Sequence, residues 1–471
     1  MSPPSLCAAT CSTPLGAAPP PLLRFRRHAV SAARATAPSV SDDLVLRIAE
    51  QLEDSARASP LLDPLRSASA LSLLSTPWPT RRSNEAFRFT DISYLRSLPI
   101  SLPAHTPAPA PPSPDAESHI LFTDGLLVSA SGAHASALAD MPPGSARDRA
   151  AAAIAASAGF SHRDIFYDFN AVGASDVAVV YVPEGAKMAD DPVHIMFGYS
   201  GSDGASMMMS NPRVLVIAEK GAEVAIVEEH FGTAEEGGGC YWANPVVDII
   251  VEEGARVVHS YVQRQSSAAA HTKWTTVQQN TSSTYEFVEV STGGKLNRHN
   301  LHIQQLGPET VTELSTFHLT SQNKQIHDLH SRLILDYPGA YSRQLHKLIA
   351  CGAGNGIFDG NIQVNRYAQQ TDAGQQTKCL LLSPKAVVNV KPNLQIIADD
   401  VKCTHGAAIS GDLDPNELFY FQARGVDVKT ATDALLFSFG AQVINRIPFK
   451  PLEQRTLAQL KELLTLSRQT N

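Results

Sequence analysis

A cysteine and a histidine stand two residues apart near the end of the chain, at Cys403 and His405. Alternate side chains of a β-strand point to the same face, so this pair would lie side by side, with Val401 on the same face. A thiolate and an imidazole are suitable ligands for iron, zinc or an iron–sulfur cluster. Two ligands are only half of such a site, and another chain would have to supply the rest. The alternative is that all three are plain core residues of the last strand.

A short aromatic helix is predicted directly after this strand. Asp414 can cap its N-terminus, Pro415 suits its first position, Glu417 can complete a capping box, and Gly425 can end it. Residues 418–421 are four consecutive large apolar or aromatic side chains, more than one helical stripe holds. The excess must pack on the body of the protein or contact another protein.

Other histidines are numerous, and we expect most of them to lie on the surface of the body or to be hydrogen-bonded within it; they are His299, His302, His318, His327, His330 and His346. His327 and His330 are three residues apart, so on a strand they point to opposite faces.

Several classes of function are disfavoured by motif and composition. The sequence contains no GxxxxGK[ST], GxSxG or HExxH motif, so the chain is not expected to be an ATPase in its own right. Its net charge of −8 disfavours a nucleic-acid surface. No apolar run reaches roughly 18 residues, so no membrane insertion is expected. The six cysteines are sparse for 471 residues, which indicates free thiols in a reducing compartment.

The N-terminal region has the composition of an organellar transit peptide. No acidic residue precedes Asp42, and the first basic residue is Arg24, in a context of Ser, Thr, Ala and Pro. An uncharged, Pro-rich start favours the plastid over the mitochondrion. A tail without any targeting role is the alternative.

The middle of the chain contains an internal repeat. The segments YVPEGAKM, IAEKGAEV and IVEEGARV place their glycines at 185, 221 and 254, which are 36 and 33 residues apart. Each copy is a strand, a tight glycine turn and a second strand, with no long helix between copies. Such units bury their apolar faces only by stacking, so we predict a β-solenoid of eight or nine coils. A β-sandwich is the main alternative. The helical tail could cover an open end of the solenoid.

Long, ordered motifs in this chain resemble the SufB/SufD family of iron–sulfur cluster assembly proteins. They are DDVKCTHGAAISG and LDPNELFYFQARGV around Cys403, and SRQLHK, IFDGNIQV and KPNLQIIADD before it, and they favour the SufD type. The PTRR run within residues 76–93 resembles the segment that opens SufD proteins. Its charges could face a partner, or the segment could be a loop held by Trp78, Phe87 and Phe89.

The resemblance implies a mainly β fold, with a right-handed parallel β-helix core between N- and C-terminal α-helical regions. It implies a non-catalytic scaffold that pairs with SufB and docks the ATPase SufC. No cofactor would be permanently bound, and His405, with Cys403 in support, would contribute to a nascent cluster at the shared interface and be a candidate metal ligand. The docking residues for SufC would be Leu418, Phe419, Tyr420, Arg424 and Gly425. The segment SPKAVVNVKP lacks the sulfur-accepting cysteine of SufB proteins.

The expected organisation follows from these assignments. Residues 1–38 form the transit peptide, 39–98 an N-terminal helical region, 99–115 a Pro/Ala-rich linker, 116–165 a connecting region with an Ala-rich helix, 166–410 the β-helix, and 411–471 the docking region. Two other functions stay open. One is a secreted-type β-helix enzyme acting on carbohydrate, although no acidic cluster repeats from coil to coil. The other is a purely structural adaptor without a cluster ligand.

Overall fold

The computed structural model describes residues 42–57, 59–104, 116–233, 239–322 and 324–469. The expected transit peptide at 1–38 and residues 105–115 of the expected linker lie outside the described residues.

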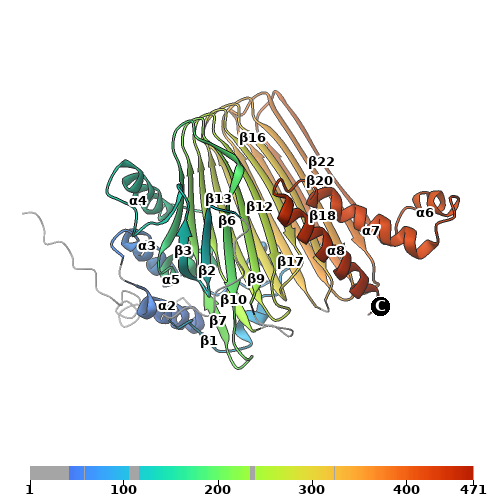
Figure 1. Ribbon diagram of the computed structural model, residues 1–471, viewed down its shortest axis with the longest axis horizontal. Helices are drawn as coiled ribbons and strands as arrows, with labels where there is room; N and C mark the ends of the chain where they lie inside the picture. The colour runs from blue at the N-terminus through green and yellow to red at the C-terminus, as the bar shows by residue number, and fades with distance from the viewer. Residues whose placement is uncertain (1–41, 58, 105–115, 234–238, 323, 470–471) are drawn as a thin grey trace, which may run out of the picture.

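The chain winds alternately through two parallel sheets that face each other, and so forms a solenoid (Figure 1). Sheet 1 contains β5 (Val177–Val182), β8 (Arg213–Ala218), β11 (Val246–Val251), β13 (Ala270–Gln279), β15 (Leu296–Gln305), β17 (Ile326–Leu335), β19 (Asn355–Val364) and β21 (Val387–Ile396). Sheet 2 contains β6 (Lys187–Tyr199), β9 (Glu223–Gly232), β12 (Arg256–Arg264), β14 (Thr284–Ser291), β16 (Val311–Thr320), β18 (Tyr341–Ala350), β20 (Thr371–Leu381) and β22 (Val401–Ser410). The chain alternates between the sheets, and the path from β5 to β21 makes about seven turns, slightly fewer than predicted.

Apolar side chains stack in columns between the two sheets. One column of sheet 1 joins Val180, Val216, Ile249, Val277, Ile303, Leu333, Ile362 and Leu394 in register. All but Leu394, which lies in the last coil, are buried. Burying one such side chain contributes roughly 1.5–3 kcal/mol, so the stacked columns hold the coils together.

The glycine of the repeat occupies the same turn in successive coils. Gly185, Gly221 and Gly254 have φ between +64° and +70°, a conformation that glycine adopts without strain. Later coils place other residues there with the same positive φ: Ser282, Glu309, Gly339 and Gln370. Each of these seven N–H groups donates to a carbonyl of the next coil, at 2.6–3.0 Å. The turn conformation is therefore kept in the later coils, where the sequence motif is no longer present.

The N-terminal helices pack beside the first coils. They are α2 (Asp43–Ser55), α3 (Asp63–Leu73), α4 (Ser145–Ser157) and α5 (Ile165–Gly173). The segment 116–165 also forms β2 (His119–Thr123), β3 (Leu126–Ser131) and β4 (Ala135–Ala137). These strands extend the sheets beyond β6 and β5 and end in antiparallel pairings, so they cover the N-terminal end of the solenoid. Short strands β1 (Ile100–Ser101), β7 (Met207–Ser210) and β10 (Tyr241–Ala243) form a side ladder on sheet 1.

A segment that we call the strap, residues 84–90, crosses the outer face of sheet 1. It includes a short 3₁₀ helix, η1 (Glu85–Phe87); a second one, η2 (Ser93–Arg96), follows it. Phe87 is buried, whereas Arg81, Arg82 and Arg88 are exposed. The wider segment 76–93 is therefore held by an aromatic side chain and still presents its arginines to solvent.

The strap is bonded to four coils in succession. Arg298 of β15 donates to the carbonyl of Ala86 at 3.0 Å, and Asp328 of β17 accepts from Thr90 at 2.5 Å. Asn355 of β19 donates to the carbonyl of Phe89, and Lys391 of β21 to the carboxylate of Glu85.

The C-terminal helices lie against the side of the solenoid and leave its end uncovered (Figure 1). They are α6 (Pro415–Gln422), α7 (Val428–Ile444) and α8 (Lys450–Gln469). Leu436, Val443 and Leu460 pack on Phe317 and its neighbours on the outer face of sheet 2. The expectation that this tail covers an open end is thus wrong, because its apolar stripe matches the outer face of sheet 2. No helix among the described residues has the length and apolar content needed to cross a membrane.

Candidate functional site

The C-terminal end of the solenoid is an open coil. Within the described part of the chain, β21 pairs only with β19, and β22 only with β20. Every residue of these two strands is exposed or half-buried, in contrast to the strands before them. The last coil therefore presents free backbone edges and inner apolar side chains, including Val390, Leu394 and Val401.

Cys403 and His405 point along the inner face of this open coil. Cys403 is in register with Ala373, and His405 with Gln375, both of which are buried between the sheets. Parallel strands in register direct such side chains to the same face, so the predicted side-by-side arrangement is present. His405 is exposed and Cys403 is half-buried. Neither side chain is fully buried by its own chain.

Cys403 lies where burial raises its thiol pKa, although a backbone hydrogen bond from Ala373 opposes the shift. The thiol is therefore mostly protonated in the isolated chain, and a metal or a nearby cation would be needed to make it a thiolate. Among the described residues, no three His, Cys, Asp or Glu side chains come together as a metal site. The thiol and the imidazole are thus an incomplete ligand set.

The predicted aromatic helix, α6, projects from the body (Figure 1). Asp414 caps it by accepting from the Asn416 N–H, and Gly425, with φ +81°, lies just beyond its end. Phe419 and Tyr420 are 69% and 55% exposed, and Leu418 is half-buried. The Arg424 guanidinium lies 3.4 Å from the centre of the Tyr420 ring. Most of the aromatic surface of this helix therefore faces solvent rather than the solenoid.

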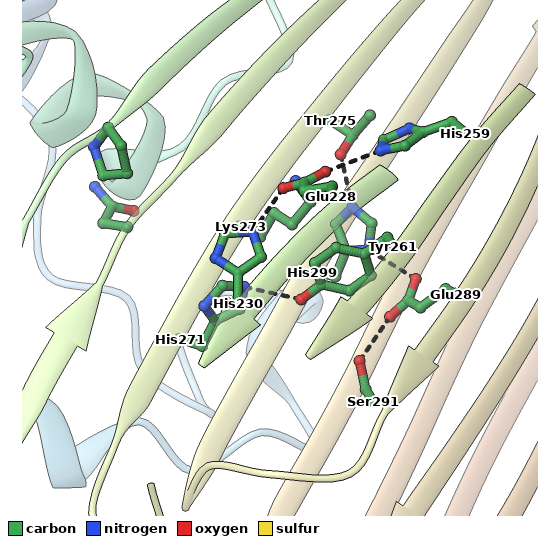
Figure 2. Close-up of polar contacts among 12 residues, drawn as sticks. Glu228, His230, His259, Tyr261, His271, Lys273, Thr275, Glu289, Ser291 and His299 are labelled. Atoms are coloured by element: carbon green, nitrogen blue, oxygen red, sulfur yellow. Dashed lines mark hydrogen bonds and ion pairs between the residues drawn. The ribbon is translucent and has the colours of Figure 1, made fainter. Parts of the chain in front are cut away.

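A network of charged and polar side chains fills the interior of the middle coils (Figure 2). We call it the lumen network, and its centre is the carboxylate of Glu228. This carboxylate accepts hydrogen bonds from His230 at 2.6 Å and His259 at 2.9 Å, and it pairs with the Lys273 ammonium at 2.5 Å. Glu289 lies farther along the solenoid and bonds His299 and His318, both at 2.8 Å.

The groups at the centre of the lumen network have strongly shifted protonation equilibria. Burial opposes ionisation of Glu228, yet Lys273 and the two histidine hydrogen bonds hold its pKa well below the usual value. Burial lowers the pKa of His230 to about 4, against the opposing effect of Glu228. The interior thus holds an ion pair surrounded by neutral imidazoles, and each group depends on its neighbours for solvation.

Comparison with protein families decides what this solenoid is. Residues 199–439, more than half of the chain, match the SufBD core domain of the SUF system for FeS cluster assembly. The chain belongs to the SufB/SufD family. This SufB/SufD-family chain is therefore a scaffold subunit of iron–sulfur cluster assembly, and its β-solenoid is the family's core domain.

Three relatives illustrate its place in the SufB/SufD family. Protein ABCI7, chloroplastic, from Arabidopsis thaliana is 47% identical over 94% of this chain and 96% of its own length. A SufBD family iron–sulfur cluster assembly protein from Synechocystis is 35% identical over 62% of this chain and 64% of its own length. The iron–sulfur cluster assembly protein SufD of Escherichia coli is 27% identical over 64% of this chain and 70% of its own length.

Sequence reasoning predicted the shared face of Cys403 and His405 and the start of α6 in this SufB/SufD-family chain, but it missed the polar interior of the solenoid. His299, His318, His327 and His346 are buried inside the solenoid, whereas His330 lies half-buried on its outer face. His327 and His330 do point to opposite faces, as predicted. Glu228 and Lys273 were missed altogether. Aligning the coils by their turns would have placed Glu228, Tyr261 and Glu289 in one column and revealed a polar interior.

Proposed function

We propose that this chain is the SufD-type subunit of a plastid assembly complex and that it pairs with a SufB-type subunit through its open coil. The supporting observation is the position of His405, exposed on the inner face of the last strand beside free backbone edges. A partner coil placed there would cover these edges and complete the ligand set for a nascent cluster. The cluster is then cargo shared by two chains, with Cys403 in a supporting role.

The other cysteines within the described residues favour a SufD-type role over that of a sulfur acceptor. Cys240, Cys351 and Cys379 are buried, and burial raises the pKa of the Cys379 thiol to about 12. A thiol in that state is a poor nucleophile for taking up sulfur. The partner subunit would therefore accept sulfur, and this chain would supply an imidazole and the geometry of the interface.

The exposed helix α6 is the docking surface that we assign to a SufC-type ATPase. Its contacts would come from Leu418, Phe419, Tyr420, Arg424 and Gly425. Aromatic side chains and arginine are the residues that most often dominate binding energy at protein interfaces. Movement of the ATPase on binding ATP would then pull on the C-terminal helices and open the coil that holds His405.

Replacing His405 with alanine is expected to reduce cluster formation by the complex about tenfold or more, because a ligand is lost while no buried contact is removed. The measurement is anaerobic reconstitution of the purified complex with iron and sulfide, followed by its charge-transfer absorbance. The control is His119→Ala, a half-buried histidine at the opposite end of sheet 2. Equal cluster yield in both variants would assign a purely structural adaptor role to this chain.

Replacing Phe419 and Tyr420 together with serine is expected to weaken binding of the ATPase by at least about 2 kcal/mol, roughly thirtyfold, since both rings would be lost from the centre of the contact. The matched control is Tyr367→Ser, an aromatic residue 76% exposed on a turn of the solenoid. Titration calorimetry with the purified ATPase gives both affinities. Unchanged affinity in the double variant would remove α6 from the interface while leaving the role of His405 untouched.

Plastid targeting is part of the proposal, supported by the composition of residues 1–38 and by the chloroplastic name of the Arabidopsis relative. A fluorescent-protein fusion to residues 1–60 would test it. Fluorescence outside the plastid would overturn the proposed location.

A further inference from the structure

A polar groove lies on the outer face of sheet 1, on the opposite side of the sheet from the lumen. Two adjacent columns of side chains form its floor across the last four coils. The first column is Asn300, His330, Asp359 and Lys391, and the second is His302, Arg332, Asn361 and Asn393. These eight side chains are polar or charged and lie in register, so they offer hydrogen-bond donors and acceptors to a hydrophilic molecule along the groove.

Two segments of the chain border the groove on its sides. Its rims are residues 84–87 of the strap on one side and His162, Arg163 and Asp164 on the other. The groove has a volume of about 490 Å³, within the range of small-molecule sites, which is roughly 300–1,000 Å³.

Four cationic side chains line the groove, and among the described residues only Arg332 has no carboxylate partner. The other three cations are paired: Arg163 with Asp168 at 3.1 Å, Arg298 with Asp328, and Lys391 with Glu85 at 3.2 Å and Asp359 at 3.5 Å. The guanidinium of Arg332 has only the Nδ1 atom of His162, at 3.4 Å. A half-buried guanidinium with free donors favours an anion.

The positive charge of Arg332 affects the pKa values of two neighbouring histidines. Burial, with smaller contributions from the charges of His162 and Arg332, lowers the pKa of His302 to about 3. Burial and Arg332 also lower the pKa of His162. Both imidazoles are therefore neutral at pH 7, and no carboxylate among the described residues forms an ion pair with Arg332. The carboxylate of Asp164 is occupied, because it accepts from the indole of Trp274 at 2.8 Å, from the side-chain amide of Asn300 at 3.3 Å and from two backbone N–H groups.

We propose that this groove binds a small hydrophilic molecule through a phosphate or carboxylate group, with the guanidinium of Arg332 as the fork that holds the oxyanion. The fork offers two parallel N–H donors, which match either group. The amides of Asn361 and Asn393 would bond the polar body of the ligand. Lys391 and Asn393 belong to β21 of the open coil, but they lie on its outer face, whereas His405 lies on the inner face. Anion binding by the isolated chain therefore does not depend on the role of His405.

The test is titration of the purified full-length chain with inorganic phosphate and, separately, with citrate, at constant ionic strength. Trp274 lines the groove, so its fluorescence reports binding alongside calorimetry. We expect at least one of the two anions to bind saturably in the millimolar range or tighter, and the stronger one identifies the oxyanion. Arg332→Gln is expected to weaken that binding at least tenfold, and Arg332→Lys to fall between the two, since lysine keeps the charge and loses the fork.

The matched control is Arg366→Gln, the same change at an exposed arginine on a turn outside the groove, which is expected to bind like the wild type. If Arg332→Gln does not fold, Asn361→Leu replaces it and is also expected to weaken binding. The proposal is overturned if neither anion saturates the wild-type chain, or if the groove variant binds as tightly as the control.

Discussion

Replacing Glu228 with leucine is expected to lower the free energy of unfolding by about 3–5 kcal/mol, because the buried ammonium of Lys273 would lose its counter-charge. His230 and His259 would lose their hydrogen-bond acceptor at the same time. Lys273 is 0% exposed, so water cannot replace the lost carboxylate. Urea unfolding followed by circular dichroism would measure the change.

The double variant Glu228→Leu/Lys273→Met is the control for this prediction. It removes both charges together, and we expect it to recover more than half of the lost stability, since an apolar pair of similar volume is often tolerated in place of a buried ion pair. A single variant that costs less than about 1 kcal/mol would show that the ammonium is not buried as a charge. Equal losses in the single and double variants would show that the histidines, rather than Lys273, depend on Glu228.

Mild acid is expected to destabilise this protein steeply, beginning below about pH 6.5. Histidines buried in the neutral state have folded-state pKa values below the unfolded value; they include His230 at about 4, His302 at about 3, and His259, His271 and His327. Between pH 6.5 and about 4 the unfolded chain binds protons that the folded chain excludes, so stability falls as the pH falls. Each such histidine contributes a slope of about 1.4 kcal/mol per pH unit.

The pH dependence can be assigned to the lumen with one variant. His230→Phe removes a group that titrates in the unfolded state, and phenylalanine can keep the stacking on Phe197, whose ring centre lies 4.2 Å away. Its unfolding free energy should fall less steeply between pH 7 and pH 5 than that of the wild type, whereas His119→Gln should keep most of the wild-type slope. A wild-type free energy that stays flat over this range would show that the interior histidines are charged in the folded protein.

The sequence predicted the solenoid because its first turns use glycine, whose spacing is visible without a structure. The later turns place Ser282, Glu309 and Gln370 in the same left-handed conformation. These residue types tolerate that conformation at some cost and carry no pattern that a reader could follow. The fold was therefore predictable from three coils, and the remaining coils were inferred from strand spacing alone.

The face of Cys403 and His405 was predictable from the period of a single strand, whereas the lumen network was not. That network is made by groups 31 and 45 residues apart in the chain, as in the pairs of Glu228 with His259 and Lys273, and coil lengths vary. Only the register between strands brings such residues together. The predicted position of the C-terminal helices was wrong for a similar reason, since their apolar stripe fits the outer face of sheet 2 as well as it would fit an end of the solenoid.

The bonds of the strap have a consequence for the order in which this molecule matures. Coils of a solenoid can wind one after another as synthesis proceeds, because each needs only its neighbour. Glu85, however, must wait for Lys391, which follows it by 306 residues. The strap is thus synthesised early but reaches its final position late. Once in place, it bonds the last four coils together, so they resist unfolding one coil at a time.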